Sequence, residues 1–290
     1  MFSKILVCSD GSKSALLGAY HASEIARKYN AKLLLLNVFD EDHAIKPFFN
    51  LWEQNIGRDT LARYIEQKQT DIEQRTQKVF EKTGMQWQTV RENGHAVESI
   101  IAVAAAEEVD LIVMGSRGLS GWKSLLLGSI SHGVLYHASC SVLIARSEAL
   151  KFQKILLASD GSEIAHKATV EAVTLAKAFA SSLTVLNVCA SLTDFAAVSN
   201  ESIQDVENSV RVREALGHSA TSGAAKSPLV FTVRREIGRP AKTILTFAEE
   251  HESDLIVLGS HGLDAASSFL LGGVSNHVVH HARCSVLVSR

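Results

Sequence analysis

Several kinds of residue are scarce in this chain, and each scarcity excludes a class of protein. The four cysteines, Cys8, Cys140, Cys189 and Cys284, form no C-x-x-C pair, so we expect buried apolar thiols in a reducing compartment and no disulfide framework. No apolar run reaches the roughly 20 residues that a membrane-spanning helix needs. The N-terminus enters a strand pattern without the basic and apolar leader of a secreted protein. We therefore expect a cytoplasmic protein with no membrane segment.

An excess of charge of one sign is also lacking. Lys and Arg total 29 and Asp and Glu total 31, which gives a formal net charge of −2. Both halves of the chain are close to balance, so neither a basic nucleic-acid-binding surface nor an acidic tail is indicated. The length of 290 residues suits two domains of ordinary size.

Histidines are numerous but scattered. Spacings of metal-ligand type occur at His277–His280–His281, at His137–Cys140 and at His281–Cys284. Tetrahedral metal sites need more ligands than the pairs supply, and histidines at helical spacing are more often partly exposed helix residues. We expect no metal site here, and the role of the three clustered histidines is left open.

What the chain does have is an internal repeat. FSKILVCSDGS at 2–12 recurs as FQKILLASDGS at 152–162, and AKLLLLNV at 31–38 recurs as SSLTVLNV at 181–188. The motifs DLIV and CSVL recur 144 residues apart, so the middle of the second copy is six residues shorter. One domain is written twice. We predict domains at 1–147 and 151–290, with a short polar joint between them.

Each copy alternates apolar strand patterns with amphipathic helices. The strands are predicted near 3–9, 32–38, 86–92, 110–115 and 141–145, and again near 153–159, 182–188, 229–235, 254–259 and 285–289. Helices are predicted in the first copy near 13–29, 56–83, 96–108 and 129–138. This alternation predicts an α/β fold with a doubly wound parallel sheet of five strands in each copy. Residues 191–227 have a weaker pattern, in which we predict one helix near 201–216.

A glycine-rich stretch follows the fourth strand of each copy. Residues 110–131 read DLIVMGSRGLSGWKSLLLGSIS, and residues 254–275 read DLIVLGSHGLDAASSFLLGGVS with the same glycine spacing. Glycines let a ligand approach the main chain, and the N-terminus of the following helix suits a phosphate. An ordinary glycine-rich connection is the alternative. The two copies at equal spacing favour a phosphate-binding site.

Two other strand ends carry polar residues twice. The first strand ends in Ser9-Asp10-Gly11-Ser12, repeated from Ser159 to Ser162, and the second ends in Asn37-Val38, repeated as Asn187-Val188. Ligands of doubly wound sheets bind at the carboxyl ends of strands. Asp10 is a candidate for a ribose hydroxyl or a metal ion on phosphates, and Val38 for a base face. The alternatives are a turn with a helix cap for Asp-Gly-Ser and a core position for Val38.

Together these motifs resemble the universal stress protein family in its tandem two-domain form. The resemblance covers nearly the whole chain twice. It implies a five-stranded parallel sheet in the order 3-2-1-4-5, of the adenine nucleotide α-hydrolase-like type, with the two copies related by a pseudo-twofold axis. Some members of the family bind ATP through this glycine pattern, and others lack both the pattern and the nucleotide.

By position, the resemblance implies a nucleotide site in each copy. The first-copy residues are Asp10, Val38, Met114, Gly115, Gly118, Gly128, Ser129 and Ile130, with the glycine loop wrapping the triphosphate largely through backbone N–H groups. The matching second-copy residues are Asp160, Val188, Leu258, Gly259, Gly262, Gly272 and Val274. The second copy departs from the pattern at Gly273, which stands where the first has Ser129, so weaker binding is expected there. His261 likewise replaces Arg117.

The resemblance also implies ligands and partners. The expected cofactor is ATP, with ADP or AMP as alternatives, together with Mg²⁺ carried on the nucleotide near Asp10. The last strands of the two copies, at 141–145 and 285–289, would pair edge to edge within one chain and cover edges prone to aggregation. Homodimerisation of the whole chain is left open.

The sequence favours a binding module over an enzyme. It has no G-K-[ST] of the Walker type, no G-x-S-x-G and no H-E-x-x-H. Asp10 is the one carboxylate expected near the phosphates. Hydrolysis also needs a base or a positioned water. We therefore expect an ATP-binding regulatory protein of the stress response. A slow ATPase or nucleotide-transferring enzyme and a nucleotide-free scaffold are the alternatives.

Overall fold

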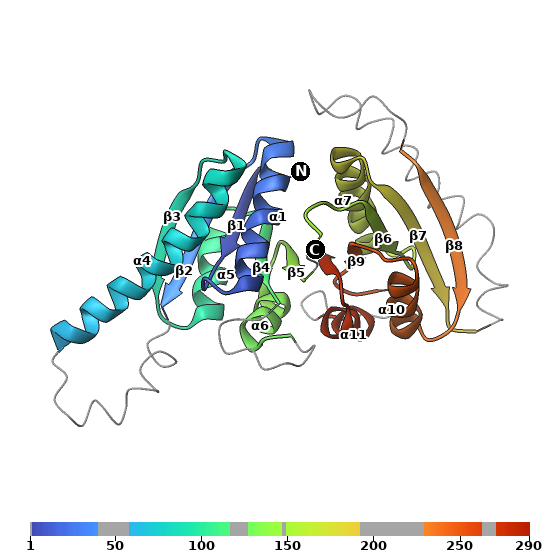
Figure 1. The fold of residues 1–290 in the computed structure, drawn as a ribbon. Coiled ribbons are helices and arrows are strands. Elements are labelled where there is room, and N and C mark those ends of the chain that lie inside the picture. The colour runs from blue at the N-terminus through green and yellow to red at the C-terminus, as the bar shows by residue number, and fades with distance from the viewer. Residues whose placement is uncertain (1, 40–57, 117–126, 147–148, 192–228, 263–270) are drawn as a thin grey trace. The chain divides into compact units, whose positions relative to one another are not determined.

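The computed structural model describes residues 2–39, 58–116, 127–146, 149–191, 229–262 and 271–290 (Figure 1). The chain divides into two compact units. One comprises residues 2–122 with 128–134, and the other comprises residues 135–290 with 123–127 and residue 1. Each unit is an α/β structure built on a largely parallel sheet.

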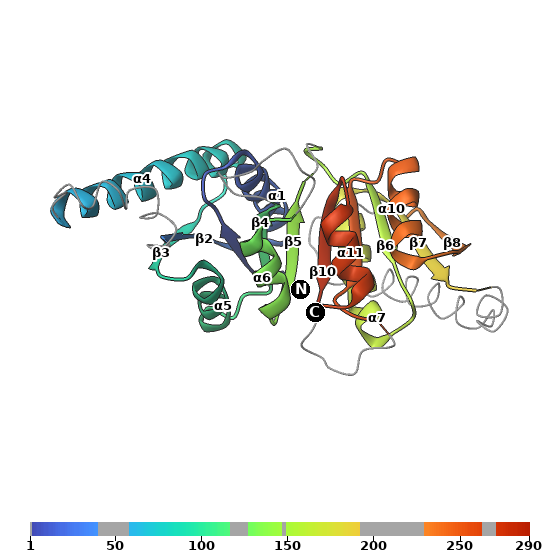
Figure 2. The same ribbon diagram turned by 90° about the horizontal axis from the view of Figure 1, so that it is seen from below.

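The first unit holds four parallel strands in the order β3-β2-β1-β4. They are β1 (Lys4–Cys8), β2 (Lys32–Phe39), β3 (Gln88–Asn93) and β4 (Leu111–Gly115). Helices α1 (Lys13–Tyr29) and α4 (Arg58–Thr83) cover one face of the sheet, and α5 (Ala96–Ala106) and the start of α6 (Ser129–His137) lie on the other (Figure 2). All five residues of β4 are buried, as expected for a central strand of a covered parallel sheet.

Helix α1 begins and ends for local reasons. The Oγ of Ser12 accepts a hydrogen bond from the backbone N–H of Ala15 at 3.3 Å and so caps the helix N-terminus. At the other end Asn30 takes the left-handed conformation, with φ of 51°, and its N–H donates to the carbonyl of Ala26. The helix buries small residues against β1 and β4, which lets it pack close to the ends of these strands.

The second unit repeats this arrangement with the strand order β8-β7-β6-β9-β10, all parallel. The strands are β6 (Lys154–Ala158), β7 (Ser182–Cys189), β8 (Phe231–Ile237), β9 (Leu255–Gly259) and β10 (Ser285–Ser289). Its helices are α7 (Glu163–Phe179), α10 (Pro240–Glu250) and α11 (Gly273–His281).

The same unit contains β5 (Ser141–Ala145), which pairs with β10 in antiparallel fashion. Leu143 lies opposite Leu287 in this pair. An arginine follows each of the two strands. Its side chain donates a hydrogen bond to a backbone carbonyl that precedes the other strand. The Nη1 of Arg146 donates to the carbonyl of Ala282 at 2.6 Å, and the Nη2 of Arg290 donates to the carbonyl of Leu135 at 2.5 Å. The antiparallel pairing gives the strand edge of β10 a partner.

The predicted fold class is confirmed. Each predicted strand is present with bounds that differ by at most two residues, and the 3-2-1-4-5 order is found complete in the second copy. The helix predicted near 201–216 lies outside the described residues. The domain limits 1–147 and 151–290 stay a prediction.

No helix in the described part of the chain combines the length and the apolar character needed to cross a membrane.

Candidate functional site

A cavity of about 100 Å³ opens where β1 and β4 end side by side. It is lined from six elements, because the ends of the central strands meet the starts of three helices there. Five of the residues predicted for the first-copy site line it together: Asp10, Val38, Met114, Gly115 and Ile130. The other lining residues were not among the predicted site residues, and they are Cys8, Ser9, Ala15, Leu36, Ala96, Ile100 and Ser131.

The segment Asp10-Gly11-Ser12 forms a turn with a helix cap, which was the alternative to a ligand-binding role. Asp10 also lines the cavity. Asp10 Oδ1 accepts a hydrogen bond from the Ser12 N–H at 3.0 Å, and Gly11 has a φ of 74°, which favours glycine. Ser12 caps α1. A turn with a helix cap is therefore present, and the carboxylate at its start belongs to the cavity wall.

Buried polar contacts hold the end of β1 in place. The Nδ2 of Asn37 donates to the carbonyl of Ser9 at 3.0 Å, and the Ser9 Oγ lies 2.8 Å from the Oγ1 of Thr76 on α4. The second copy repeats the first of these contacts between Asn187 and Ser159 at 2.9 Å. The asparagine that the sequence repeats therefore fixes the strand end beside the aspartate in both copies.

Gly115 lines the cavity and also has a packing role. A Cβ built on Gly115 would lie 2.6 Å from the backbone N of Ala15 and 2.6 Å from the carbonyl carbon of Ser14. Only glycine lets the end of β4 approach the N-terminus of α1 so closely. In the second copy, a Cβ on Gly259 would meet a side-chain methyl of Ile164 at 2.7 Å. The repeated glycine at this position thus serves the strand–helix contact in both copies.

The backbone N–H groups of Gly128 and Gly272 are already used within the protein. The first donates to the carbonyl of Ser116 at 2.9 Å, and the second donates to the carbonyl of Ser260 at 2.8 Å. These two amides are therefore not among the N–H groups open to a phosphate in this structure. The first backbone N–H groups of α6, beginning with that of Ser129, have no acceptor within the helix because they lie at its N-terminus.

The first turn of α6 is fastened to the end of β4. The Ser131 Oγ donates to the carbonyl of Gly115 at 2.9 Å, and Ser275 makes the same contact with Gly259 at 2.7 Å. Ser129 is exposed, and the side chain of Ile130 is 41% exposed although it lines the cavity. The helix start therefore presents both amides and an open apolar side chain to the crevice. Gly118 lies outside the described residues.

In the second copy the acidic turn and the glycine loop meet directly. Asp160 Oδ1 accepts from the Ser162 N–H at 3.0 Å, as in the first copy. A Cβ on Gly262 would come within 2.3 Å of Asp160 Oδ2. The carboxylate at the end of β6 therefore lies next to the start of the loop after β9.

The other second-copy positions are exposed to about the same degree as their first-copy counterparts. Val188 is half-buried, Leu258 is buried, and Val274 is 39% exposed at the start of α11. A Cβ on Gly273 would meet nothing within 4 Å. The imidazole of His261, which stands where the first copy has Arg117, lies 3.0 Å from the Ser260 Oγ.

The lining of the first-copy cavity is mostly apolar, with few charged side chains. Among the twelve residues that line it there is no histidine, lysine or arginine, and Asp10 is the one carboxylate. General acid–base catalysis normally needs a second titrating group placed on the reacting atoms. No group of three or more His, Cys, Asp or Glu side chains within the described ranges is arranged to hold a metal ion.

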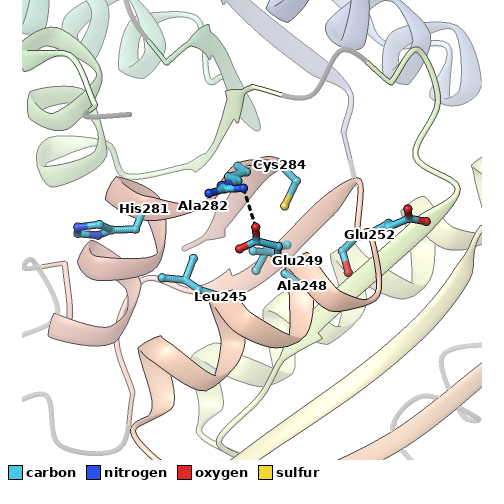
Figure 3. Close-up of a pocket in the computed structure, with 10 residues that line it drawn as sticks. Leu245, Ala248, Glu249, Glu252, His281, Ala282 and Cys284 are labelled. Atoms are coloured by element: carbon cyan, nitrogen blue, oxygen red, sulfur yellow. Dashed lines mark hydrogen bonds and ion pairs between the residues drawn. The ribbon is translucent and has the colours of Figure 1, made fainter. Parts of the chain in front are cut away.

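A second hollow, of about 280 Å³, lies between α10 and the end of α11 (Figure 3). Its charged groups neutralise each other, since Arg283 Nη1 lies 2.6 Å from Glu249 Oε1. Burial raises the pKa of the Cys284 thiol to about 12, so this cysteine stays protonated near neutral pH and is a poor nucleophile. The hollow offers no reactive group to a ligand.

Comparison with known proteins agrees with the repeated fold. The profile of the universal stress protein family matches residues 1–146 and again residues 151–290. The chain belongs to the universal stress protein family.

Relatives of this universal stress protein include both tandem and single-domain proteins. A universal stress protein of Mycobacterium bovis is 25% identical over 304 residues, which covers 99% of this chain and 96% of the relative. The universal stress protein YxiE of Bacillus subtilis is 32% identical over 150 residues, which covers 50% of this chain and the whole of YxiE. The crystal structure of a universal stress protein from Archaeoglobus fulgidus has the same fold, with a TM-score of 0.71, 24% identity and coverage of 99% and 96% of the two chains.

Proposed function

We propose that this universal stress protein binds an adenine nucleotide in its first copy and acts as a regulatory module of the stress response. The observation that carries the proposal is the cavity at the ends of β1 and β4, which gathers Asp10, Val38 and the start of α6 at one place. The apolar side of the cavity, with Val38, Leu36 and Ile130, suits an adenine base. The amides of the first turn of α6 suit a phosphate.

Asp10 is the residue that would hold Mg²⁺ together with the phosphates. Mg²⁺ keeps several waters and is typically bound through one or two carboxylates and the phosphate oxygens of the nucleotide. A single carboxylate at the edge of the cavity fits that requirement. The cation would neutralise phosphate charge, since no lysine or arginine lines the cavity.

We infer binding without efficient hydrolysis. The residues described around the cavity include no base beside Asp10, and one oxygen of Asp10 already accepts the Ser12 N–H. A slow ATPase would release phosphate in a reaction that Asp10→Ala abolishes. A scaffold that needs no nucleotide would neither carry ligand from the cell nor gain thermal stability from ATP.

The second copy is proposed as a weaker site. It lacks the hydroxyl of Ser129 because Gly273 takes that position, and a lost hydrogen bond to a ligand costs about 1 kcal/mol. We further propose that the antiparallel pairing of β5 with β10 is the intramolecular joint between the copies. This joint would replace a contact that separate single-domain chains make by dimerising. A cytoplasmic location belongs to the same proposal, and none of the four cysteines is disulfide-bonded.

The duplicated sequence offers a matched test of the nucleotide site. Titration calorimetry with ATP and Mg²⁺ is expected to show a tighter and a weaker site in the wild type. Asp10→Ala should weaken the tighter site by about tenfold, since charge-assisted contacts are worth roughly 1.5–3 kcal/mol. Asp160→Ala should affect only the weaker site. Equal effects of both substitutions on one class of site, or none from Asp10→Ala, would argue against the assignment.

A further inference from the structure

The second copy carries a groove whose charge differs from that of the matching positions in the first copy. It lies between β8 and α10 and has a volume of about 600 Å³. Its lining residues are Arg234, Glu236, Gly238, Arg239, Lys242, Thr243, Thr246, Phe247, Glu250 and His251. None of them belongs to the crevice between Asp160 and the glycine loop, so the groove is separate from the proposed nucleotide site.

The duplication shows how the charge of this groove differs between the copies. With the 144-residue offset, the cations Arg234, Arg239 and Lys242 stand where the first copy has Val90, His95 and Glu98. The matching first-copy positions hold neither lysine nor arginine, and they include three carboxylates, Glu92, Glu98 and Glu107. The second-copy lining has two carboxylates, Glu236 and Glu250. The β8–α10 region of the second copy is therefore cationic, whereas the matching region of the first copy is acidic.

The three cations are not used for internal ion pairs. In the described ranges, Arg234, Arg239 and Lys242 make no salt bridge and no side-chain hydrogen bond, whereas other cations of this unit do. All three side chains are exposed. Cations gathered at one groove without protein partners repel each other and attract an anion.

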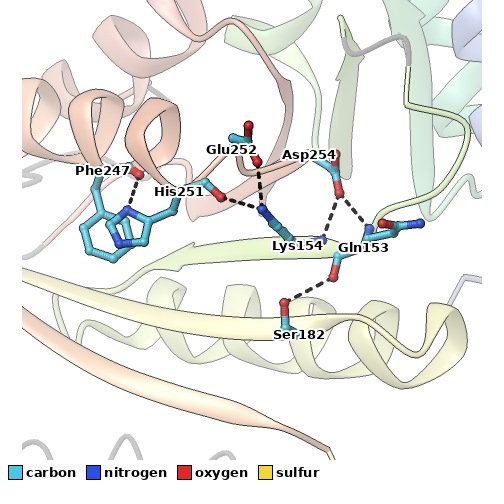
Figure 4. A network of polar contacts seen from close by, with 7 residues as sticks. All are labelled: Gln153, Lys154, Ser182, Phe247, His251, Glu252 and Asp254. Carbon is cyan, nitrogen blue, oxygen red and sulfur yellow. Dashed lines mark hydrogen bonds and ion pairs between the residues drawn. The ribbon is translucent and has the colours of Figure 1, made fainter.

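The walls of the groove are held in a fixed arrangement. Phe247 is buried, and the ring of His251 stacks on it with the centroids 3.9 Å apart and the planes 8° apart. His251 Nδ1 lies 2.9 Å from the Phe247 carbonyl, and the His251 carbonyl accepts from Lys154 Nζ at 3.2 Å (Figure 4). The turn into α10 is tight, since a Cβ on Gly238 would lie 2.5 Å from Thr243 Oγ1. A preformed wall lowers the cost of ordering a ligand.

We propose that this groove binds a small, multiply charged anion of the phosphate-ester class. Its volume falls in the range of small-molecule sites, which is about 300–1,000 Å³. The guanidinium groups of Arg234 and Arg239 offer planar pairs of donors that match phosphate oxygens, and Lys242 adds a third positive charge. The ligand would lie along the groove between β8 and the first turns of α10.

The test uses inorganic tripolyphosphate as the probe, titrated calorimetrically at low salt. Lys242→Glu introduces the residue type that the first copy has at this position, Glu98. It should weaken binding of tripolyphosphate by about tenfold or more. Lys151→Glu makes the same change of charge at an exposed position away from the groove and should alter affinity less than about twofold. The triple variant R234V/R239H/K242E, which copies the first domain, should abolish binding to the groove. Thermal melting of each variant establishes that it is folded.

The outcomes separate this proposal from the nucleotide site. If tripolyphosphate also binds at the start of α6, that binding survives Lys242→Glu, and only the groove component is lost. Equal weakening by Lys242→Glu and Lys151→Glu would mean general charge attraction and would overturn the proposal. An absence of binding to the wild type would overturn it as well.

Discussion

Gly115 ends β4 in the first copy and Gly273 begins α11 in the second, and the surroundings of these two glycines differ. Gly115 touches the backbone of α1, whereas a Cβ on Gly273 would enter open space. The sequence pattern predicted that both lie at a ligand crevice, but it could not separate a glycine needed for packing from one that is not. That distinction depends on the contact of Gly115 with Ser14 and Ala15, which lie about 100 residues earlier in the chain.

Gly115→Ala is expected to destabilise the protein. The added methyl would lie 2.6 Å from backbone atoms of α1 that cannot move aside freely. Overpacking of this kind costs about 1–3 kcal/mol in the free energy of unfolding. Gly273→Ala is the matched control and should be neutral or stabilising by up to about 1 kcal/mol. Urea unfolding of both variants measures this, and equal stability of the two would contradict the packing role of Gly115.

Gly273→Ser should strengthen nucleotide binding at the second copy. The substitution supplies the hydroxyl that Ser129 has in the first copy, and it fits because nothing lies within 4 Å of the added Cβ. One additional hydrogen bond is worth about 1 kcal/mol, or roughly a fivefold gain in affinity. Calorimetry on the Asp10→Ala background isolates the weaker site. An unchanged affinity there would show that the hydroxyl at this position does not contact the ligand.

At the scale of elements, hydrophobic periodicity was sufficient to predict the strands and most helices. The central strands agree with this periodicity because they are short buried runs, as is typical of a covered parallel sheet. The outer strands β3 and β8 are half-buried or exposed along their whole length. The pattern could not show that Gly128 donates its amide to Ser116. It also could not show that the β8–α10 element reverses its charge around a groove, since that requires knowing which side chains face one hollow.

Helix α7 carries a buried carboxylate against β5. Glu171 Oε1 accepts a hydrogen bond from the Ser141 Oγ at 2.6 Å, and burial raises the pKa of Glu171 above its ordinary value. The folded state therefore holds its proton to higher pH than the unfolded state does. The contribution of Glu171 to stability is full below the unfolded pKa of about 4.3 and is lost as pH rises through the folded pKa.

Glu171→Gln should therefore stabilise the protein near neutral pH. The amide keeps the shape and an acceptor for Ser141 but has no charge to bury. The difference in melting temperature between variant and wild type should grow as pH rises from 4 toward 8. Glu163→Gln, at the exposed start of α7, is the control and should show no such growth. A stability difference that stays constant over this pH range would contradict a raised pKa.

At the scale of the whole molecule, the two copies keep one fold and diverge at their binding features. The strand order, the Asn–Ser contact at the end of the first strand and the serine on the last helix are retained in both. Changes occur at Gly273, at His261 and around the β8–α10 groove. The differences between the copies therefore lie outside the strand framework that they share.

The central claim is that the first copy holds an adenine nucleotide at the ends of β1 and β4. Native mass spectrometry of protein purified without added nucleotide tests it most directly, by identifying the ligand and counting it per chain. We predict between one and two molecules of adenine nucleotide on the wild type, and a loss of the more abundant one in Asp10→Ala but not in Asp160→Ala. A wild-type chain that carries no nucleotide, and takes up none when ATP and Mg²⁺ are added, would contradict the account.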